Sequence, residues 1–280
     1  MGLPAEKATE SALPVAEALP KSRVGRKSNL RVLRLIALPL LLLLVWQIGA
    51  TLQLINPLLL PPVDKVFRAA YQLFVTGDLY AHFISSIVRI FYANLLAIGL
   101  AVPLGFLIGL YLWFEDLFDP LVNLLRPIPP LAWIPLAILW FGVGEKSVVF
   151  ITFISAFFAI LINTMVGVRS VEKSLVRAAL SLGASRWILI TQVILPATMP
   201  YLFTGFRIAL GVSWMSIVAA EMIAATSGLG FLISYYRELL RSDLILVGMI
   251  SIGAIGFLMD RAVLWLERKL LPWRVSLKLG

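Results

Sequence analysis

The sequence predicts an all-α, polytopic membrane protein with about six transmembrane helices. Three observations predict this class: 60% of the 280 residues are hydrophobic, only 14% are charged, and the mean hydropathy is +0.95. A soluble domain is typically about 25% charged. Six spans of about 20 residues each leave roughly 160 residues for loops and tails. The chain therefore has no room for a large soluble enzyme domain.

The amino-terminal segment, residues 1–30, is predicted to be a disordered cytoplasmic tail, and residues 31–280 to form the membrane domain. The tail is rich in Ala, Pro, Glu, Lys and Ser and has no apolar period. A cleaved signal peptide is the alternative. Against it, the apolar run continues to Val63 without a good small-residue cleavage site.

Stretches without charge predict the spans in chain order. They cover residues 35–63, 90–114, 127–144 and 147–168, a stretch after Trp187 that only Arg207 and Glu221 interrupt, and residues 244–259. The first helix is expected to end near residue 54, because Asn56-Pro57 and then Pro61-Pro62 follow it. An extended segment should come next.

The distribution of Lys and Arg predicts the orientation. Outside the spans, 16 of these residues fall on the side of the amino terminus and five on the other side. Because basic residues accumulate on the cytoplasmic side, both termini are expected in the cytoplasm, with the chain in the inner (plasma) membrane. The connection that carries Glu115, Asp116 and Asp119 is an acidic exception. We attribute the net charge of +9 to orientation rather than to nucleic-acid binding.

Several kinds of chemistry are disfavoured by composition. The chain has no Cys and one His, His82, which we expect to be a solvated loop residue. The run Gly142-Val-Gly-Glu-Lys-Ser147 is similar to a phosphate-binding loop, but Glu145 stands where that loop needs Gly directly before Lys146. We therefore expect no cofactor and no ATPase site in this chain, and an energy source in a partner.

The second span carries small residues at a four-residue spacing: Ala93, Ala97, Ala101, Gly105 and Gly109. These residues form a smooth stripe against which another helix can approach closely. Helix packing is the preferred interpretation, and pore lining is the alternative.

The connection at residues 168–192 predicts a helix, a glycine turn and a second helix. Leu175, Ala178, Ala179 and Leu182 share one mildly apolar helix face, and Gly183 follows it, where a left-handed cap favours glycine. A second short helix from Ser185 to about residue 192 is expected before Leu195-Pro196. Such a unit suits docking in a groove of another protein. A helix lying in the membrane interface is the alternative.

This connection resembles a known signature. The run Ala178-Ala179, Gly183 and Val193-Ile194-Leu195-Pro196 is similar to the EAA signature of the membrane subunits of binding-protein-dependent ABC importers with the type I permease fold. Arg177 stands where that family commonly has Glu, and Val193 where it has Ile. Residues 125–135, 140–145, 202–211 and 219–222 resemble the nitrate, sulfonate and taurine branch. The resemblance covers roughly residues 30–280.

The resemblance implies a set of partners and a coupling loop. It implies a second permease copy forming a homodimer, two cytoplasmic ATPase subunits that hold ATP and Mg, an external substrate-binding protein and the lipid bilayer, with no nucleic acid and no covalent chemistry in this chain. The loop would transmit the closing of the ATPases to the membrane helices. The residues assigned to it are Lys173, Leu175, Arg177, Ala178, Ala179, Leu182, Gly183, Ala184, Leu195 and Pro196.

The resemblance also implies a small oxyanion as the substrate. Nitrate or nitrite is the first choice, bicarbonate the second, and sulfonates or taurine the third. Selectivity in such importers rests chiefly with the binding protein. A stand-alone channel or secondary carrier is the alternative class, but the chain has neither internal repeats nor paired intramembrane carboxylates. A membrane-embedded enzyme would need a cluster of His, Asp, Glu or Lys at one depth, and the buried candidates in this sequence are isolated.

Four residues are candidates for the translocation path: Arg207, Glu221, Arg89 and Pro130. Arg207 and Glu221 are 14 residues apart, which leaves them about 40° apart around a helix, on nearly the same side. The alternative is that Arg207 snorkels to the cytoplasmic surface and Glu221 meets water outside. Arg89 has the same ambiguity. Pro127, Pro129, Pro130 and Pro135 either expose backbone carbonyls to a cavity or form a re-entrant loop that only packs.

Overall fold

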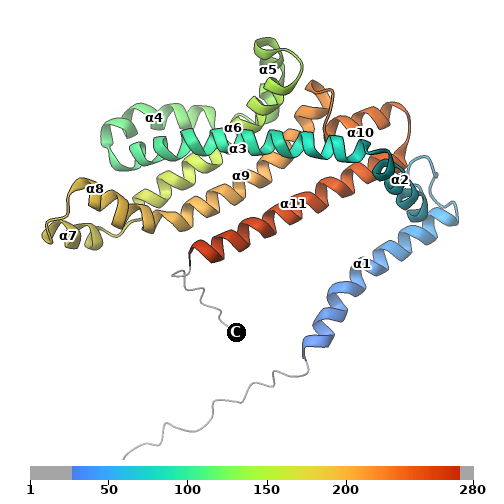
Figure 1. The fold of residues 1–280 in the computed structure, drawn as a ribbon, viewed down its shortest axis with the longest axis horizontal. Coiled ribbons are helices and arrows are strands. Elements are labelled where there is room, and N and C mark those ends of the chain that lie inside the picture. Colours follow the sequence, from blue (N-terminus) through green and yellow to red (C-terminus); the bar gives the residue numbers. More distant parts are fainter. Residues whose placement is uncertain (1–26, 272–280) are drawn as a thin grey trace, which may run out of the picture.

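The computed structural model describes residues 27–271, with side chains described from residue 37 onward. Over this part of the chain the fold is all-α, as predicted (Figure 1). Most of the predicted tail lies outside the described residues. Its last four residues do not, and they are helical rather than disordered, since α1 runs from Lys27 to Thr51.

Four long apolar helices in the described residues can cross a membrane by length and composition. They are α3 (Asp78–Leu110), α6 (Glu145–Arg169), α9 (Leu195–Ala224, which continues the preceding turns from Arg186) and α11 (Ser242–Leu270). They match the predicted second, fourth, fifth and sixth spans. α3 begins twelve residues before the predicted start at residue 90.

The predicted third span, residues 127–144, is occupied by two short helical segments, which form a bent pair with the helix before them. α4 (Leu112–Leu125) and the segment of η1 (Pro130–Trp133) and α5 (Ile134–Phe141) are bent by 88° relative to each other. The proline-rich connection explains the bend, because Pro129 is extended at ψ 139° and proline lacks the N–H that would continue a helix. α5 consequently projects from the bundle (Figure 1). The acidic connection is also not a loop, because Glu115 lies in the first turn of α4.

The first predicted stretch, residues 35–63, holds one helix, α1, which ends at Thr51, close to the expected residue 54. Residues 52–62 are not helical and form turns and bends, and α2 (Val63–Thr76) begins at the last residue of the stretch. The Trp46 Nε1–H donates to the Pro61 carbonyl at 3.0 Å, and the Val63 N–H donates to the Gln47 side chain at 2.7 Å. These bonds fasten the end of α1 to the start of α2.

The small-residue stripe packs against α6. Ala93, Ala97 and Ala101 are fully buried. A Cβ on Gly105 would lie 2.7 Å from the Thr164 Cβ, and a Cβ on Gly109 would lie 2.7 Å from a Val168 methyl group. The helix-packing interpretation is thus confirmed, because these backbones approach too closely for larger side chains.

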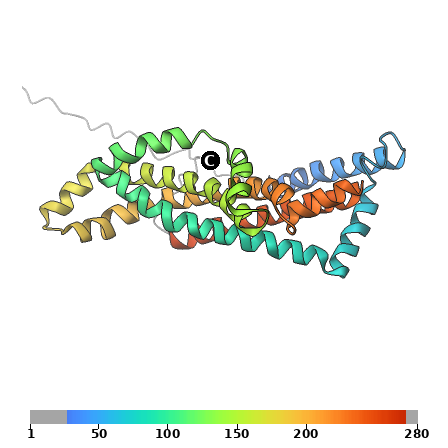
Figure 2. The same ribbon diagram turned by 90° about the horizontal axis from the view of Figure 1, so that it is seen from above.

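The molecule is elongated, with different elements at its two ends. α7 (Lys173–Ser181) and α8 (Arg186–Ile188) lie at one end, and α2 and α10 (Leu229–Glu238) lie at the other (Figure 2). α6 is the central helix and packs between α3 and α9. The predicted docking segment, formed by α7 and α8, therefore lies at the opposite end of the bundle from α2 and α10 (Figure 2).

Candidate functional site

The segment between α6 and α9 has the predicted helix–turn–helix shape. α7 ends at a Schellman cap: Gly183 has φ +80°, its N–H donates to the Leu180 carbonyl at 3.0 Å, and the Ala184 N–H donates to the Ala179 carbonyl at 3.0 Å. The Ser185 side chain then accepts the Ile188 N–H at 3.4 Å and caps α8. The glycine conformation is required here because other residues rarely adopt this φ.

The sequence predicts that the second helix of this unit ends at about residue 192, before Leu195-Pro196. In the structure it does not end there. α8 continues through a π-helical segment, η2 (Leu189–Ile194), directly into α9. Pro196 lies in the first turn of α9, two residues after this π-helical segment. The wider π-helical turn before it accommodates the proline ring without breaking the helix.

The predicted apolar face of α7 is not covered by the described chain. α7 buries none of its residues, and Leu182 is 89% exposed. Leu175 and Trp187 are also exposed, while Ala179 is half-buried. Lys173 and Arg177 lie on the same exposed helix. Exposed Leu and Trp beside basic residues form a surface that suits a protein partner.

An ion-pair group connects the end of α6 to α4. The Arg169 guanidinium, at the end of α6, lies 3.0 Å from Glu115 and 3.8 Å from Asp119. All three side chains are about 40% exposed. The acidic exception to the basic-residue pattern therefore has a local partner.

A second polar cluster is centred on Arg89, whose side chain is only 2% exposed. Its Nε donates to Glu145 at 2.6 Å, and its Nη2 donates to the other oxygen of the same carboxylate. Its Nη1 donates to Glu221 at 2.7 Å and to the Ser227 carbonyl at 2.7 Å, and its Nη2 also donates to the Ser227 hydroxyl at 2.7 Å. All five N–H donors of the guanidinium are thereby paired.

Glu221 is fully buried, and the elements around it supply its partners. The Ser86 hydroxyl lies 2.8 and 2.9 Å from its two oxygens, and the Gly230 N–H donates to it at 2.9 Å. A Cβ on Gly228, at φ +111°, would lie 2.3 Å from this carboxylate, and one on Gly230 would lie 2.3 Å from the Val218 carbonyl. Glycine is needed at both positions so that the start of α10 can approach α9.

His82 is not a solvated loop residue, so that prediction is wrong. It lies in α3, half-buried, and its Nδ1 accepts the Gly228 N–H at 3.0 Å. The ring also packs against Phe231. Sequence placed it in a loop because the amino-terminal third of α3 is too polar to be read as part of a span.

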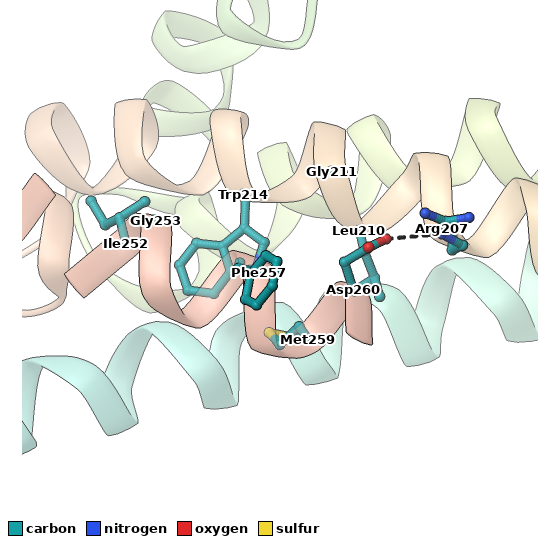
Figure 3. Close-up of a pocket in the computed structure, with 10 residues that line it drawn as sticks. Arg207, Leu210, Gly211, Trp214, Ile252, Gly253, Phe257, Met259 and Asp260 are labelled. Carbon is teal, nitrogen blue, oxygen red and sulfur yellow. Dashed lines mark hydrogen bonds and ion pairs between the residues drawn. The ribbon is translucent and has the colours of Figure 1, made fainter. Parts of the chain in front are cut away.

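Arg207 and Glu221 do not share an environment, although both lie on α9. The Arg207 Nε donates to the Asp260 carboxylate of α11 at 2.9 Å, and both side chains are about 40% exposed. The pair borders a groove of about 230 Å³ between α9 and α11, with Gly211, Trp214 and Phe257 among its lining residues (Figure 3). Glu221 is instead turned into the interior, because its hydrogen-bond donors lie on α3 and α10.

Comparison with known proteins decides the family. Residues 101–272 match the family described as "Binding-protein-dependent transport system inner membrane component". The chain belongs to this family.

Several relatives of the chain are permease subunits of transport systems. The chain is 44% identical to a putative ABC transporter permease protein of Methanocaldococcus jannaschii, covering 92% of this chain and 98% of the relative. It is 42% identical to the taurine transport system permease protein TauC of Escherichia coli, covering 83% and 86%. It is 38% identical to the bicarbonate transport system permease protein CmpB of Synechococcus elongatus, covering 82% and 86%.

A solved structure supports the fold. An inward-facing structure of the MetNI methionine ABC transporter matches with a TM-score of 0.51 at 19% identity, covering 64% of this chain and 93% of that chain. At that identity the match concerns the fold alone. The chain is accordingly an inner-membrane, multi-pass ABC permease subunit, and like its relatives it is a transport subunit rather than an ATPase.

In this permease the structure brings together only some of the predicted path residues. Arg89 and Glu221 are in direct contact, Arg207 lies elsewhere with Asp260, and Pro130 begins the short helix η1 at the bend before α5. From sequence, Ser86 is recognised one helical turn before Arg89 but is not assigned to the site, and the roles of Glu145 and of the turn at residues 227–230 are missed. The spacing of Ser86 and Arg89, one helical turn apart, was a signal for a shared polar face, and the Gly-Leu-Gly run after Ser227 was a signal for close backbone approach.

Proposed function

We propose that this permease is the membrane-spanning subunit of an ATP-driven importer and forms the translocation path for a small oxyanion. Nitrate or nitrite is the first candidate, with bicarbonate and then sulfonates or taurine as alternatives. The relatives support the oxyanion class, because TauC is a permease of taurine transport and CmpB is a permease of bicarbonate transport. Each of these molecules carries an anionic oxygen group.

The observation that carries the ATP-driven mechanism is the uncovered α7–α8 segment. A largely exposed apolar and basic face with a glycine-capped turn projects from one end of the bundle (Figure 1), and α7 buries none of its residues in the described chain. We propose that an ATPase subunit takes this segment into a groove, and that α8 and η2 transmit its motion to α9, with which they are continuous. Two permease copies, two ATPases and an external binding protein would form the complete importer.

The proposal includes an orientation. The α7–α8 end, which would meet cytoplasmic ATPases, is expected to be cytoplasmic together with both chain termini. Cysteine substitution at Leu182 and at Glu238, at opposite ends of the bundle, tests this orientation with a membrane-impermeant thiol reagent. The chain has no native Cys to interfere. External labelling of Leu182→Cys would contradict the orientation.

The function is tested by uptake into vesicles that contain the permease, its ATPase and its binding protein. ATP-dependent accumulation of nitrate, with bicarbonate and taurine measured in parallel, is the expected result. Uptake that proceeds equally without the ATPase would instead identify a channel or a secondary carrier. Transport of taurine or bicarbonate but not nitrate would keep the mechanism and change the substrate.

A further inference from the structure

We propose that the side of the Arg89 guanidinium that now binds Glu145 is an anion-binding site, and that Glu145 occupies it as an exchangeable carboxylate. The inference rests on the proposed function in one respect, namely that the transported molecule is an anion. It assigns to Glu145 the role of an internal competitor, which leaves the site when a substrate anion takes its place.

The two carboxylates on Arg89 differ sharply in exposure. Glu221 is fully buried, whereas the Glu145 side chain is 67% exposed although it binds the same guanidinium. Glu145 is also the first residue of α6, directly after Gly144 at φ +135°. Rotation of its side chain away from Arg89 therefore disturbs no buried packing, and Arg89 becomes reachable from the side that Glu145 leaves.

The guanidinium would remain in place after that exchange. Glu221 and the Ser227 carbonyl hold its Nη1, and the Ser227 hydroxyl holds one hydrogen of its Nη2. Departure of Glu145 frees only the Nε–H and the other Nη2 hydrogen, which point in parallel toward one side. Such a pair of donors binds a planar or tetrahedral oxyanion through two oxygens, as it now binds the carboxylate.

The exchange also conserves charge. Glu145 and a monoanion such as nitrate carry the same charge, so replacement of one by the other leaves the net charge at the guanidinium unchanged. Glu221 stays paired with the Arg89 Nη1 and keeps its hydrogen bonds from the Ser86 hydroxyl and the Gly230 N–H. The anion would also lie close to the amino-terminal end of α6, where Glu145 is now located and where the helix dipole favours negative charge.

The decisive experiment measures anion binding to the permease–ATPase complex in nanodiscs, without ATP and without the binding protein. The probe is nitrate, titrated against chloride at constant ionic strength, and the readout is the melting temperature of the complex. Glu145→Gln removes the competing charge but keeps the side-chain shape. We expect the half-saturating nitrate concentration to fall by about tenfold, because a neutral amide is a weaker ligand of Arg89 than a carboxylate.

Two further variants make the result specific. Glu238→Gln removes an exposed carboxylate at the end of α10 and should leave the nitrate response as in the parent protein. Arg89→Lys combined with Glu145→Gln should abolish the response, since an ammonium group does not offer two parallel donors. If that double variant does not assemble, the comparison of nitrate with chloride in Glu145→Gln alone serves the same purpose, because chloride cannot bind through two oxygens.

Specific outcomes would overturn the inference. Equal nitrate dependence in the parent and in Glu145→Gln would show that Glu145 is only a structural clamp. An equal response to chloride, or a response that survives in the double variant, would remove Arg89 from the site. These failures differ from failure of the proposed function, which is an absence of ATP-driven uptake of all three anions by the parent complex.

Discussion

The Glu221 carboxylate, with none of its side chain exposed, lies 2.7 Å from the Arg89 Nη1. The two residues are 132 positions apart in sequence and belong to α9 and α3. Their contact joins the two helices that flank α6, and through Ser227 and Gly230 it also holds the start of α10. A buried carboxylate of α9 with donors from both α3 and α10 is therefore a structural junction of this permease.

Replacing Glu221 with Leu should destabilise the permease strongly. The change would leave the Ser86 hydroxyl, the Gly230 N–H and one of the two Arg89 Nη1 hydrogens without an acceptor. Loss of one partner of a buried ion pair costs about 3–5 kcal/mol. Glu221→Gln keeps one acceptor oxygen and should cost less. The melting temperature of the purified protein measures both effects. Melting of Glu221→Leu at the parent temperature would show that the junction contributes nothing to stability.

Gly105→Ala should destabilise the packing of α3 on α6. The added Cβ would lie 2.7 Å from the Thr164 Cβ and 3.2 Å from the Leu161 carbonyl, and overpacking of this kind costs about 1–3 kcal/mol. Gly99→Ala in the same helix is the matched control, because nothing lies within 4 Å of its Cβ position. The control should melt at or above the parent temperature. Equal melting of the two variants would contradict this account of the stripe.

Gly183→Val should impair association with the ATPase. Nothing lies within 4 Å of the Cβ position, so the expected effect comes from backbone strain at φ +80° and not from a clash. Gly183→Asn is the control, since Asn tolerates this conformation better than most residues. Co-purification of the ATPase and ATP-driven uptake measure the result. Normal amounts of ATPase together with normal uptake in Gly183→Val would refute the docking proposal.

The Arg207–Asp260 pair should behave as a unit. Arg207→Gln and Asp260→Asn each leave one charge unpaired beside the groove, whereas the double variant leaves none. We therefore expect uptake by the double variant to exceed uptake by either single variant, as a double-mutant cycle in vesicles would reveal.

Unequal effects of the two single substitutions would instead assign the two residues different roles. Strong loss of uptake in Arg207→Gln with normal uptake in Asp260→Asn would place the Arg207 charge on the anion path. In that case Arg207→Lys should retain part of the activity, because the charge stays while the fork geometry is lost.

Several features followed from the sequence alone because they depend on local order. Long apolar stretches predicted the all-α membrane fold, and the four-residue spacing of Ala93, Ala97 and Ala101 predicted close packing of one helix face. Gly183 directly after a short amphipathic stretch predicted a left-handed cap, which the structure contains. Each of these inferences needs only residues within a few turns of one another.

Only the tertiary structure decided which polar groups meet. Arg89 binds Glu145 and Glu221, which are 56 and 132 positions away, and Arg207 binds Asp260, 53 positions away. Glu221 and Arg207 lie on nearly one side of α9, yet one is buried and the other exposed, because different helices cover the two ends of that side. Helical periodicity places a side chain on a face, but the packing of α3, α10 and α11 determines what that face contacts.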